Sequence, residues 1–226
     1  MELPVQIALH PGDKICLKRP DSSELGRRII SESIYLIDEL GFEQFTFRKL
    51  AVRIESTEAS VYRYFENKHR LLLYLIDWYW NWIDVRLSYA IVNLDNPEEK
   101  LRRAIRLLTE KVEMDTSTMH VDEVRLQRIV IVESSKTYLT KTVDDENTEG
   151  CFGIFKDVVE RVADLIKEVA PAYRYPHMLV STVIEGAHHQ RFFADHLPKL
   201  TNQHRGEDSV ERFYQDLVFH AIHSDL

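Results

Sequence analysis

The sequence predicts an all-α protein. Apolar residues recur at helical spacing along most of the 226 residues, and only seven Gly and seven Pro interrupt them. Residues that favour helix N-caps stand before several of these segments. With 44% hydrophobic residues, the chain can bury a core large enough for one or two domains.

The first twenty residues depart from this helical pattern. Apolar residues alternate with polar or small ones on both sides of a Pro-Gly-Asp turn at 11–13, which predicts a small β-hairpin. Its alternating residues are Val5, Ile7, Leu9, Ile15 and Leu17. Asp21 or Ser22 is then expected to cap the first helix, which runs to about Leu40 and ends at Gly41.

Two short helical periods follow in residues 46–68. Thr46 can cap the first, whose inward residues are Phe47, Leu50, Ala51 and Ile54. Thr57 can cap the second, whose inward residues are Val61 and Phe65. Two short helices joined by a few polar residues form a helix-turn-helix pattern, and the outer surface of the second helix suits contact with a DNA groove.

At these positions the sequence resembles the TetR family of bacterial transcriptional regulators. The family pattern is roughly Thr-x-Arg-x-Ile/Leu-Ala, then four or five residues, then a recognition helix with Leu/Val-Tyr-x-Tyr/His-Phe, then a small polar residue and Lys. The matching residues are Thr46, Arg48, Leu50, Ala51, Val61, Tyr62, Tyr64, Phe65, Asn67 and Lys68. Glu55 stands where the family usually has Gly, and Glu58 and Ala59 also depart from the pattern.

The resemblance implies an N-terminal three-helix DNA-binding head followed by a helical effector-binding and dimerisation body. We therefore expect an extension at residues 1–20, the DNA-binding domain at 21–70 and the body at 71–226. The extension is either a flap packed on the first helices or a basic arm that reaches DNA through Lys14, Lys18 and Arg19.

The expected DNA-binding residues lie at the caps and on the outer surface of the motif. They are Thr46, Arg48, Thr57, Glu58, Ala59, Ser60, Tyr62, Arg63, Tyr64 and Lys68. Arg48, Tyr62 and Lys68 are expected to position the protein on phosphates. The residues expected to face the bases are Glu58, Ser60, Arg63 and Tyr64.

The charge distribution is compatible with a DNA-binding head. The net charge is −8, but basic and acidic residues balance at eleven each within residues 1–76, so the acidic excess lies in residues 77–226. A neutral head can bind DNA if its cations face the phosphates, with an affinity that falls steeply with salt.

The remaining two thirds of the chain predicts body helices. They are expected at about 69–92, from Pro97 to about Val112, and at about 122–135, 152–169, 176–194 and 208–223, with a loop at 142–149. The first is expected to connect head and body and not to span a membrane, because charged residues interrupt it. Arg102, Arg103 and Arg106 are expected on a solvated helix face.

Two sites are expected in the body from the resemblance. An effector pocket between helices would be lined by aromatic residues, namely Trp78, Trp82, Tyr89, Tyr138, Phe152 and Phe155. The last two helices would pair with a second subunit as a homodimer through Leu179, Val183, Ala187, Val210, Phe213, Leu217 and Ala221.

No catalytic motif is visible, so we expect neither an enzyme nor a cofactor. Glu185, His188 and His189 share a helix face as in bundle metal sites, but no matching pattern occurs on a second helix, so a polar patch is the preferred interpretation. Two distant Cys and no export signal favour the cytoplasm.

The function that these observations favour is a sequence-specific DNA-binding transcriptional regulator, acting as a repressor controlled by a small-molecule effector. The alternative is a ligand- or protein-binding helical module whose head no longer recognises DNA.

Overall fold

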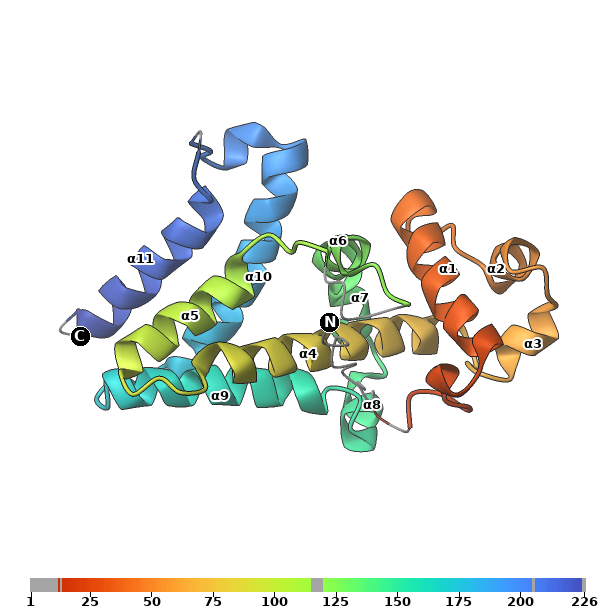
Figure 1. The fold of residues 1–226 in the computed structure, drawn as a ribbon, viewed down its shortest axis with the longest axis horizontal. Helices are drawn as coiled ribbons and strands as arrows, with labels where there is room; N and C mark the ends of the chain where they lie inside the picture. The colour runs from red at the N-terminus through yellow and green to blue at the C-terminus, as the bar shows by residue number, and fades with distance from the viewer. Residues whose placement is uncertain (1–11, 13, 115–119, 205, 225–226) are drawn as a thin grey trace, which may run out of the picture. The chain divides into compact units, whose positions relative to one another are not determined.

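The structure is a computed structural model that describes residues 12, 14–114, 120–204 and 206–224. Within these residues it contains eleven α-helices, two short 3₁₀ turns and no strand (Figure 1). The helices are α1 (Glu24–Leu40), α2 (Phe47–Arg53), α3 (Glu58–Tyr62), α4 (Lys68–Ile91), α5 (Pro97–Thr109), α6 (Glu123–Glu133), α7 (Ser135–Tyr138), α8 (Val143–Glu149), α9 (Gly153–Val169), α10 (Pro176–His196) and α11 (Ser209–His223). The 3₁₀ turns are η1 (Pro20–Ser22) and η2 (Pro198–Leu200). The predicted all-α class is confirmed.

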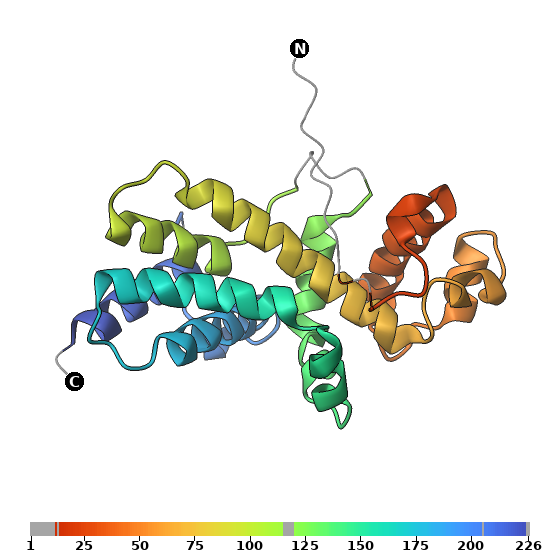
Figure 2. The same ribbon diagram turned by 90° about the horizontal axis from the view of Figure 1, so that it is seen from below.

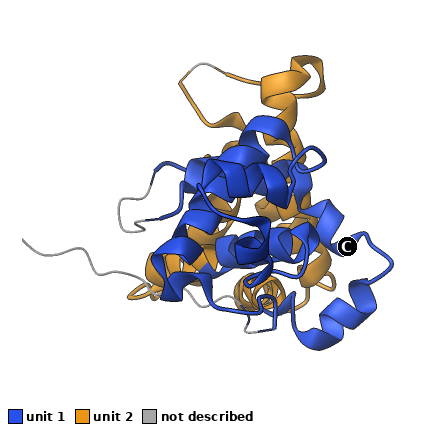
Figure 3. Ribbon diagram, turned by 90° about the vertical axis from the view of Figure 1, so that its right-hand side faces the viewer, with its two compact units in different colours: residues 1–81, 112–153 blue, residues 82–111, 154–226 orange. Residues whose placement is uncertain are grey.

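The helices group into two compact units, coloured separately in Figure 3. Unit 1 comprises residues 1–81 and 112–153, and unit 2 comprises residues 82–111 and 154–226. Helix α4, drawn in the yellow part of the colour scale in Figure 2, has its residues 68–81 in unit 1 and 82–91 in unit 2. The sequence predicts a DNA-binding domain at residues 21–70 and an effector-binding and dimerisation body at 71–226. These functional boundaries differ in kind from the two compact units and stay a prediction.

Side-chain caps define the helix starts in unit 1. Ser23 caps α1 by accepting a hydrogen bond from the Gly26 N–H, so the prediction that Asp21 or Ser22 caps this helix is wrong. Asp21 and Ser22 lie instead in η1. Gly41, with a φ of 77°, ends α1 as expected, because Gly adopts this conformation without a side-chain clash.

The predicted β-hairpin is not supported. Its first strand lies outside the described residues, and residues 14–17 form a turn and irregular backbone instead of a second strand. Ile15 is only 3% exposed, and the Leu17 N–H donates to the Tyr64 carbonyl at 2.8 Å. This part of the chain is therefore packed onto the helices of unit 1.

The predicted loop at 142–149 is also wrong, because residues 143–149 form α8. Three consecutive acidic residues lie in its first turn, where their negative charges interact favourably with the positive end of the helix dipole. Glu146 pairs with His69 at 2.8 Å and Glu149 with Arg70 at 2.7 Å. These contacts with α4 stabilise a short helix that the polar sequence alone would not indicate.

In unit 2, α5, α10 and α11 pack against one another. Their buried residues include Ile105, Val183, Ile184 and Val218, each fully buried. Arg191 of α10 donates to the Thr109 carbonyl and pairs with Asp208, which caps α11. None of the helices in the described part of the chain is apolar over a stretch long enough to cross a membrane.

Candidate functional site

The helix-turn-helix in unit 1 is built on a tightly packed core. Thr46 accepts a hydrogen bond from the Lys49 N–H, and Thr57 accepts one from the Ser60 N–H, so both predicted caps are present. Each residue expected to point inward is at most 5% exposed, namely Phe47, Leu50, Ala51, Ile54, Val61 and Phe65. Local sequence and packing therefore agree on the orientation of α2 and α3.

The turn between α2 and α3 contains a strained residue. Glu55 has a φ of 50°, in the left-handed region that disfavours residues with a side chain. Arg28 of α1 holds the preceding turn through a 2.6 Å hydrogen bond to the Ile54 carbonyl. Glu55 therefore has a backbone conformation that glycine adopts more readily than glutamate.

We expect Glu55→Gly to stabilise the head by roughly 0.5–1 kcal/mol, because Gly adopts a positive φ without the steric cost. The midpoint of urea unfolding, followed by circular dichroism, measures the effect. Glu58→Gly is the control: Glu58 begins α3, where Gly lowers helix stability. A lower midpoint for Glu55→Gly would contradict the expectation.

Most of the expected DNA-binding residues are accessible. Thr46, Arg48, Thr57, Glu58, Ala59, Tyr62 and Arg63 are exposed, and Ser60 is half-buried. Among the described residues, no carboxylate lies within ion-pairing distance of Arg48 or Arg63. These two guanidinium groups are therefore available for an anionic partner, whereas Arg53 pairs with Glu32 at 2.7 Å.

Tyr64 is placed differently. Its side chain is 3% exposed, and its hydroxyl shares a 2.7 Å hydrogen bond with Ser23 Oγ. The prediction that Tyr64 faces the bases is therefore wrong. The residue joins the end of the recognition helix to the N-cap of α1, and the aromatic residue in the family pattern has a packing role here.

Lys68 is also committed within unit 1. Its ammonium group donates to the carbonyls of Phe42, Glu43 and Phe45 at 3.0, 3.1 and 3.3 Å. The same group lies 4.7 Å from the centre of the Phe42 ring. Because these contacts use its three N–H donors, Lys68 secures the α1–α2 connection and is not free for the predicted phosphate contact.

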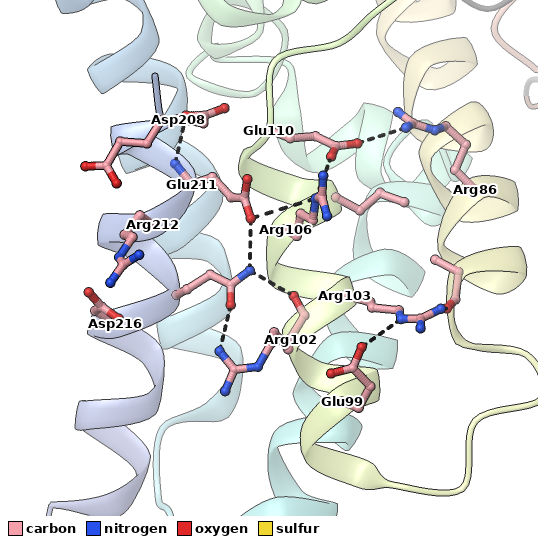
Figure 4. A pocket seen from close by; sticks show the side chains of 14 residues that line it. Arg86, Glu99, Arg102, Arg103, Arg106, Glu110, Asp208, Glu211, Arg212 and Asp216 are labelled. Carbon is pink, nitrogen blue, oxygen red and sulfur yellow. Dashed lines mark hydrogen bonds and ion pairs between the residues drawn. The ribbon is translucent and has the colours of Figure 1, made fainter. Parts of the chain in front are cut away.

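A cavity in the body is lined by charged residues and not by aromatic ones. It measures about 840 Å³ and lies in unit 2, with lining residues from α4, α5 and α11 and from the residues just before α11 (Figure 4). Five arginines and six carboxylates line it: Arg86, Arg102, Arg103, Arg106 and Arg212 with Glu99, Glu110, Glu207, Asp208, Glu211 and Asp216. The arginines of α5, expected on a plain solvated face, thus border a cavity.

Ion pairs join the three helices around this cavity. Glu110 accepts from Arg86 at 2.8 Å and from Arg106 at 3.3 Å, and Arg106 also lies 3.8 Å from Glu211 (Figure 4). Arg102 has a neutral partner, Gln215, at 3.1 Å. In the sequence, only the spacing of the α5 arginines at i, i+1 and i+4 indicates this lining. The partner residues on α4 and α11 are distant in sequence, so the sequence did not indicate a cavity.

The six aromatic residues predicted for the effector pocket do not line this cavity. Trp82 is 1% exposed, in the core of unit 2, whereas Tyr89 is 67% exposed. Trp78, Tyr138 and Phe152 belong to unit 1 and Phe155 to unit 2, and these four are half-buried. The aromatic pocket stays a prediction for these four, and the structure gives no enclosed role to Tyr89.

The residues predicted for the dimer interface divide into two groups. Val183, Ala187 and Val210 are at most 5% exposed, so they belong to the core of the protomer and cannot form an interface surface. Leu179 and Ala221 are half-buried, while Phe213 and Leu217 are 54% and 37% exposed. Only this second group is accessible to a partner.

The Glu185, His188 and His189 patch lies on α10, within unit 2. His188 is 5% exposed, and burial together with the neighbouring His189 lowers the pKa of its imidazole to about 4. The described residues include no group of three or more His, Cys, Asp or Glu side chains arranged to hold a metal ion.

Comparisons with known proteins agree with the site. The family described as "Bacterial regulatory proteins, tetR family" matches residues 29–75, which include α1 from Ile29, the helix-turn-helix and the start of α4. No curated protein matches the chain.

Three solved structures share the fold at low sequence identity. AibR in complex with isovaleryl coenzyme A and operator DNA has a TM-score of 0.57 and 15% identity, over 91% of this chain and 98% of that chain. The ketosteroid transcriptional regulator KstR2 of Mycobacterium tuberculosis has a TM-score of 0.56 and 13% identity, over 87% and 93%. The superantigen PfiT has a TM-score of 0.56 and 15% identity, over 88% and 97%.

The matched residues include those that form the capped helix-turn-helix, and AibR and the ketosteroid transcriptional regulator KstR2 share the all-α fold of the chain. Residues 29–75 therefore match the helix-turn-helix domain of the tetR family of bacterial regulatory proteins, and the chain as a whole has the all-α fold of the solved structures that it resembles.

Proposed function

We propose that the protein is a homodimeric, sequence-specific repressor in the bacterial cytoplasm whose DNA binding is controlled by a small-molecule effector. The observation that carries this proposal is the outer surface of α2 and α3. Arg48 and Arg63 are both exposed there, with no carboxylate in ion-pairing distance among the described residues. Exposed cations on a rigid helix-turn-helix suit contact with a DNA groove and its phosphates.

The accessible residues divide into two roles. Arg48 and Tyr62 position the head on phosphates, together with the backbone N–H groups near Thr46 and Thr57 at the two helix starts. Glu58, Ser60 and Arg63 face the bases, and Ala59 allows close approach of α3. Glu58 at the first position of α3 suits the helix dipole and can accept a hydrogen bond from cytosine.

A dimer is needed for this mode of reading. A helix-turn-helix reads two half-sites about 34–36 Å apart only when two copies are held together. The exposed Phe213 and Leu217 lie on the same face of α11, one turn apart, and Met178 of α10 is 67% exposed. Apolar side chains of this size on the last two helices support a partner-facing surface there.

Control by an effector is supported by the charged cavity of unit 2. A lining of five arginines and six carboxylates suits a polar ligand that carries charged groups. AibR, which shares the fold, holds both isovaleryl coenzyme A and operator DNA in its structure. Native mass spectrometry of the purified protein would identify a ligand that remains bound.

We expect Arg63→Ala to relax the preference at one base position, at a cost of about 1–3 kcal/mol if the contact is bidentate. A binding-site selection assay measures the preference. Arg48→Ala is the control, because losing a phosphate contact weakens binding to all sequences alike and reduces the salt dependence. An unchanged base preference for Arg63→Ala would remove Arg63 from the base-reading residues.

The proposal is tested by a gel shift of the wild-type protein with the upstream region of its own gene at two salt concentrations. A shift that weakens at higher salt is the expected result. No shift at low salt would favour a ligand- or protein-binding module with a head that does not read DNA. The strained Glu55 and the acidic Glu58 are the two residues that make this alternative worth the measurement.

A further inference from the structure

The residues before η1 connect two parts of unit 1. We call residues 12 and 14–19 the N-terminal strap. At one end the Gly12 N–H donates to Asp77 Oδ2 of α4 at 3.0 Å. Ile15 is buried at 3% exposure, and at the other end the Leu17 N–H donates to the Tyr64 carbonyl at 2.8 Å. The strap is therefore anchored on α4 and at the end of the recognition helix.

The second anchor fixes the position of Lys18. Its ammonium group lies 5.1 Å from the centre of the Tyr64 ring, one residue beyond Arg63 in the chain. Tyr64 is itself held by Ser23 at 2.7 Å, so the ring is a rigid support for the cation. Lys18 is exposed, and among the described residues no carboxylate lies within ion-pairing distance of it.

The neighbouring cations are placed differently. Arg19, just before η1, pairs with Asp21 at 2.8 Å, so its charge is compensated by a carboxylate two residues away. Lys14 borders a separate cavity of about 330 Å³ together with Glu66 and Glu149. Of the three basic residues in the strap, only Lys18 is exposed, fixed beside α3, and without a carboxylate of the described residues in ion-pairing distance.

We propose that the N-terminal strap is part of the DNA-binding surface and that Lys18 contacts a phosphate beside the C-terminal end of the recognition helix. This inference rests on the proposed function. A recognition helix in the major groove is flanked by phosphates, and a cation fixed at its end can reach one of them. Contact with one ring face leaves N–H donors of the ammonium group for a phosphate oxygen.

The test is fluorescence anisotropy with two labelled duplexes, one from the upstream region of the protein's own gene and one of random sequence and equal length. Over a series of salt concentrations, Lys18→Ala should weaken binding to both duplexes about five- to tenfold near 0.1 M salt. It should also reduce the slope of log K against log salt by about 0.9, the change expected for one phosphate contact.

Lys14→Ala is the matched control, since it removes the same charge from the same segment and should change the slope little. Equal effects of Lys18→Ala and Lys14→Ala would overturn the proposal, because general charge then explains both. If the wild-type protein itself does not bind the upstream duplex, that result contradicts the proposed function, and the inference about Lys18 that rests on it is then contradicted as well.

A second variant tests the role of the strap. Leu17→Pro removes the N–H that donates to Tyr64 and leaves the charge of Lys18 in place. Because Leu17 is 60% exposed, the core is not altered directly. If the strap holds Lys18 in position, Leu17→Pro lowers affinity, and the double variant with Lys18→Ala loses no more than the larger single loss. Additive losses would show that Lys18 acts without the strap and would overturn this part of the proposal.

Discussion

We expect Asp77→Asn to make the protein more stable above pH 7 and to remove the pH dependence of stability that Asp77 contributes between about pH 4 and pH 6. Asp77 is 5% exposed on α4, and burial raises the pKa of its carboxyl to about 6 despite hydrogen bonds from the Gly12 N–H and the Asn81 amide. The charged form therefore costs free energy in the folded state, by at most about 3 kcal/mol for a shift of roughly two pH units.

The sign of the pH effect follows from the raised pKa. Between the unfolded value of 3.8 and the folded value of about 6, the folded state binds more protons than the unfolded state. The contribution of Asp77 to stability therefore improves as the pH falls from 7 to 4. Urea unfolding at pH 5 to 8 measures this, and the advantage of Asp77→Asn over the wild type should shrink towards pH 5.

Asp38→Asn is the control for removing a carboxylate charge, because the folded structure lowers the pKa of Asp38 whereas it raises the pKa of Asp77. Burial raises the pKa of Asp38, but hydrogen bonds and charges of Arg128 and Arg125 lower it further, so the net pKa lies below the ordinary value. Both arginines lie within 2.7 Å of Asp38 Oδ2. Asp38→Asn should lower stability at pH 7. A loss of stability for Asp77→Asn of the same size would contradict the first expectation.

We expect Gly26→Ala to lower the free energy of unfolding by about 1–3 kcal/mol, although Ala is the better helix former. Gly26 lies in the first turn of α1 and packs against η1. A Cβ atom there would stand 2.7 Å from both the carbonyl carbon and the Cα of Pro20, and still closer to the Pro20 oxygen. These are backbone atoms, which cannot rotate away, so the clash outweighs a propensity gain of about 1 kcal/mol.

Urea unfolding followed by tryptophan fluorescence measures this change, since all three tryptophans lie on α4. Gly153→Ala provides a matched control at the first residue of α9, where an added Cβ meets no atom within 4 Å. It should be neutral or slightly stabilising. If Gly26→Ala stabilised the protein as much as the control, the close packing of η1 on α1 would be refuted.

Much of the head could be derived from local sequence. The caps at Thr46 and Thr57 and the inward apolar residues depend on interactions over three or four positions, and such interactions are visible as spacing. The N-cap predicted for α1, Asp21 or Ser22, differs from the observed cap, Ser23. Neighbouring Ser residues can both cap a helix, and the 3₁₀ turn that begins at Pro20 takes up Asp21 and Ser22, which leaves Ser23 as the cap. The same limit applies to α8, whose ion pairs come from α4.

The sequence was a weaker guide to which of the predicted site residues are exposed. Tyr64 and Lys68 match the TetR pattern and carry groups suited to DNA, yet one is buried against Ser23 and the other is bound to three carbonyls of the α1–α2 connection. Val183 and Val210 share the helix period of an interface and lie in the protomer core. Periodicity shows that a face is apolar but not which neighbour covers it.

By itself, the sequence determined that the protein is helical and where its helix-turn-helix lies, because capping and helical periodicity are short-range properties. Only the tertiary structure decided which of the expected contacts are free for DNA, that the N-terminal strap lies against the recognition helix, and that charged residues of α4, α5 and α11 surround one cavity. Each of these depends on contacts between residues far apart in the chain, such as Leu17 with Tyr64 and Arg106 with Glu211.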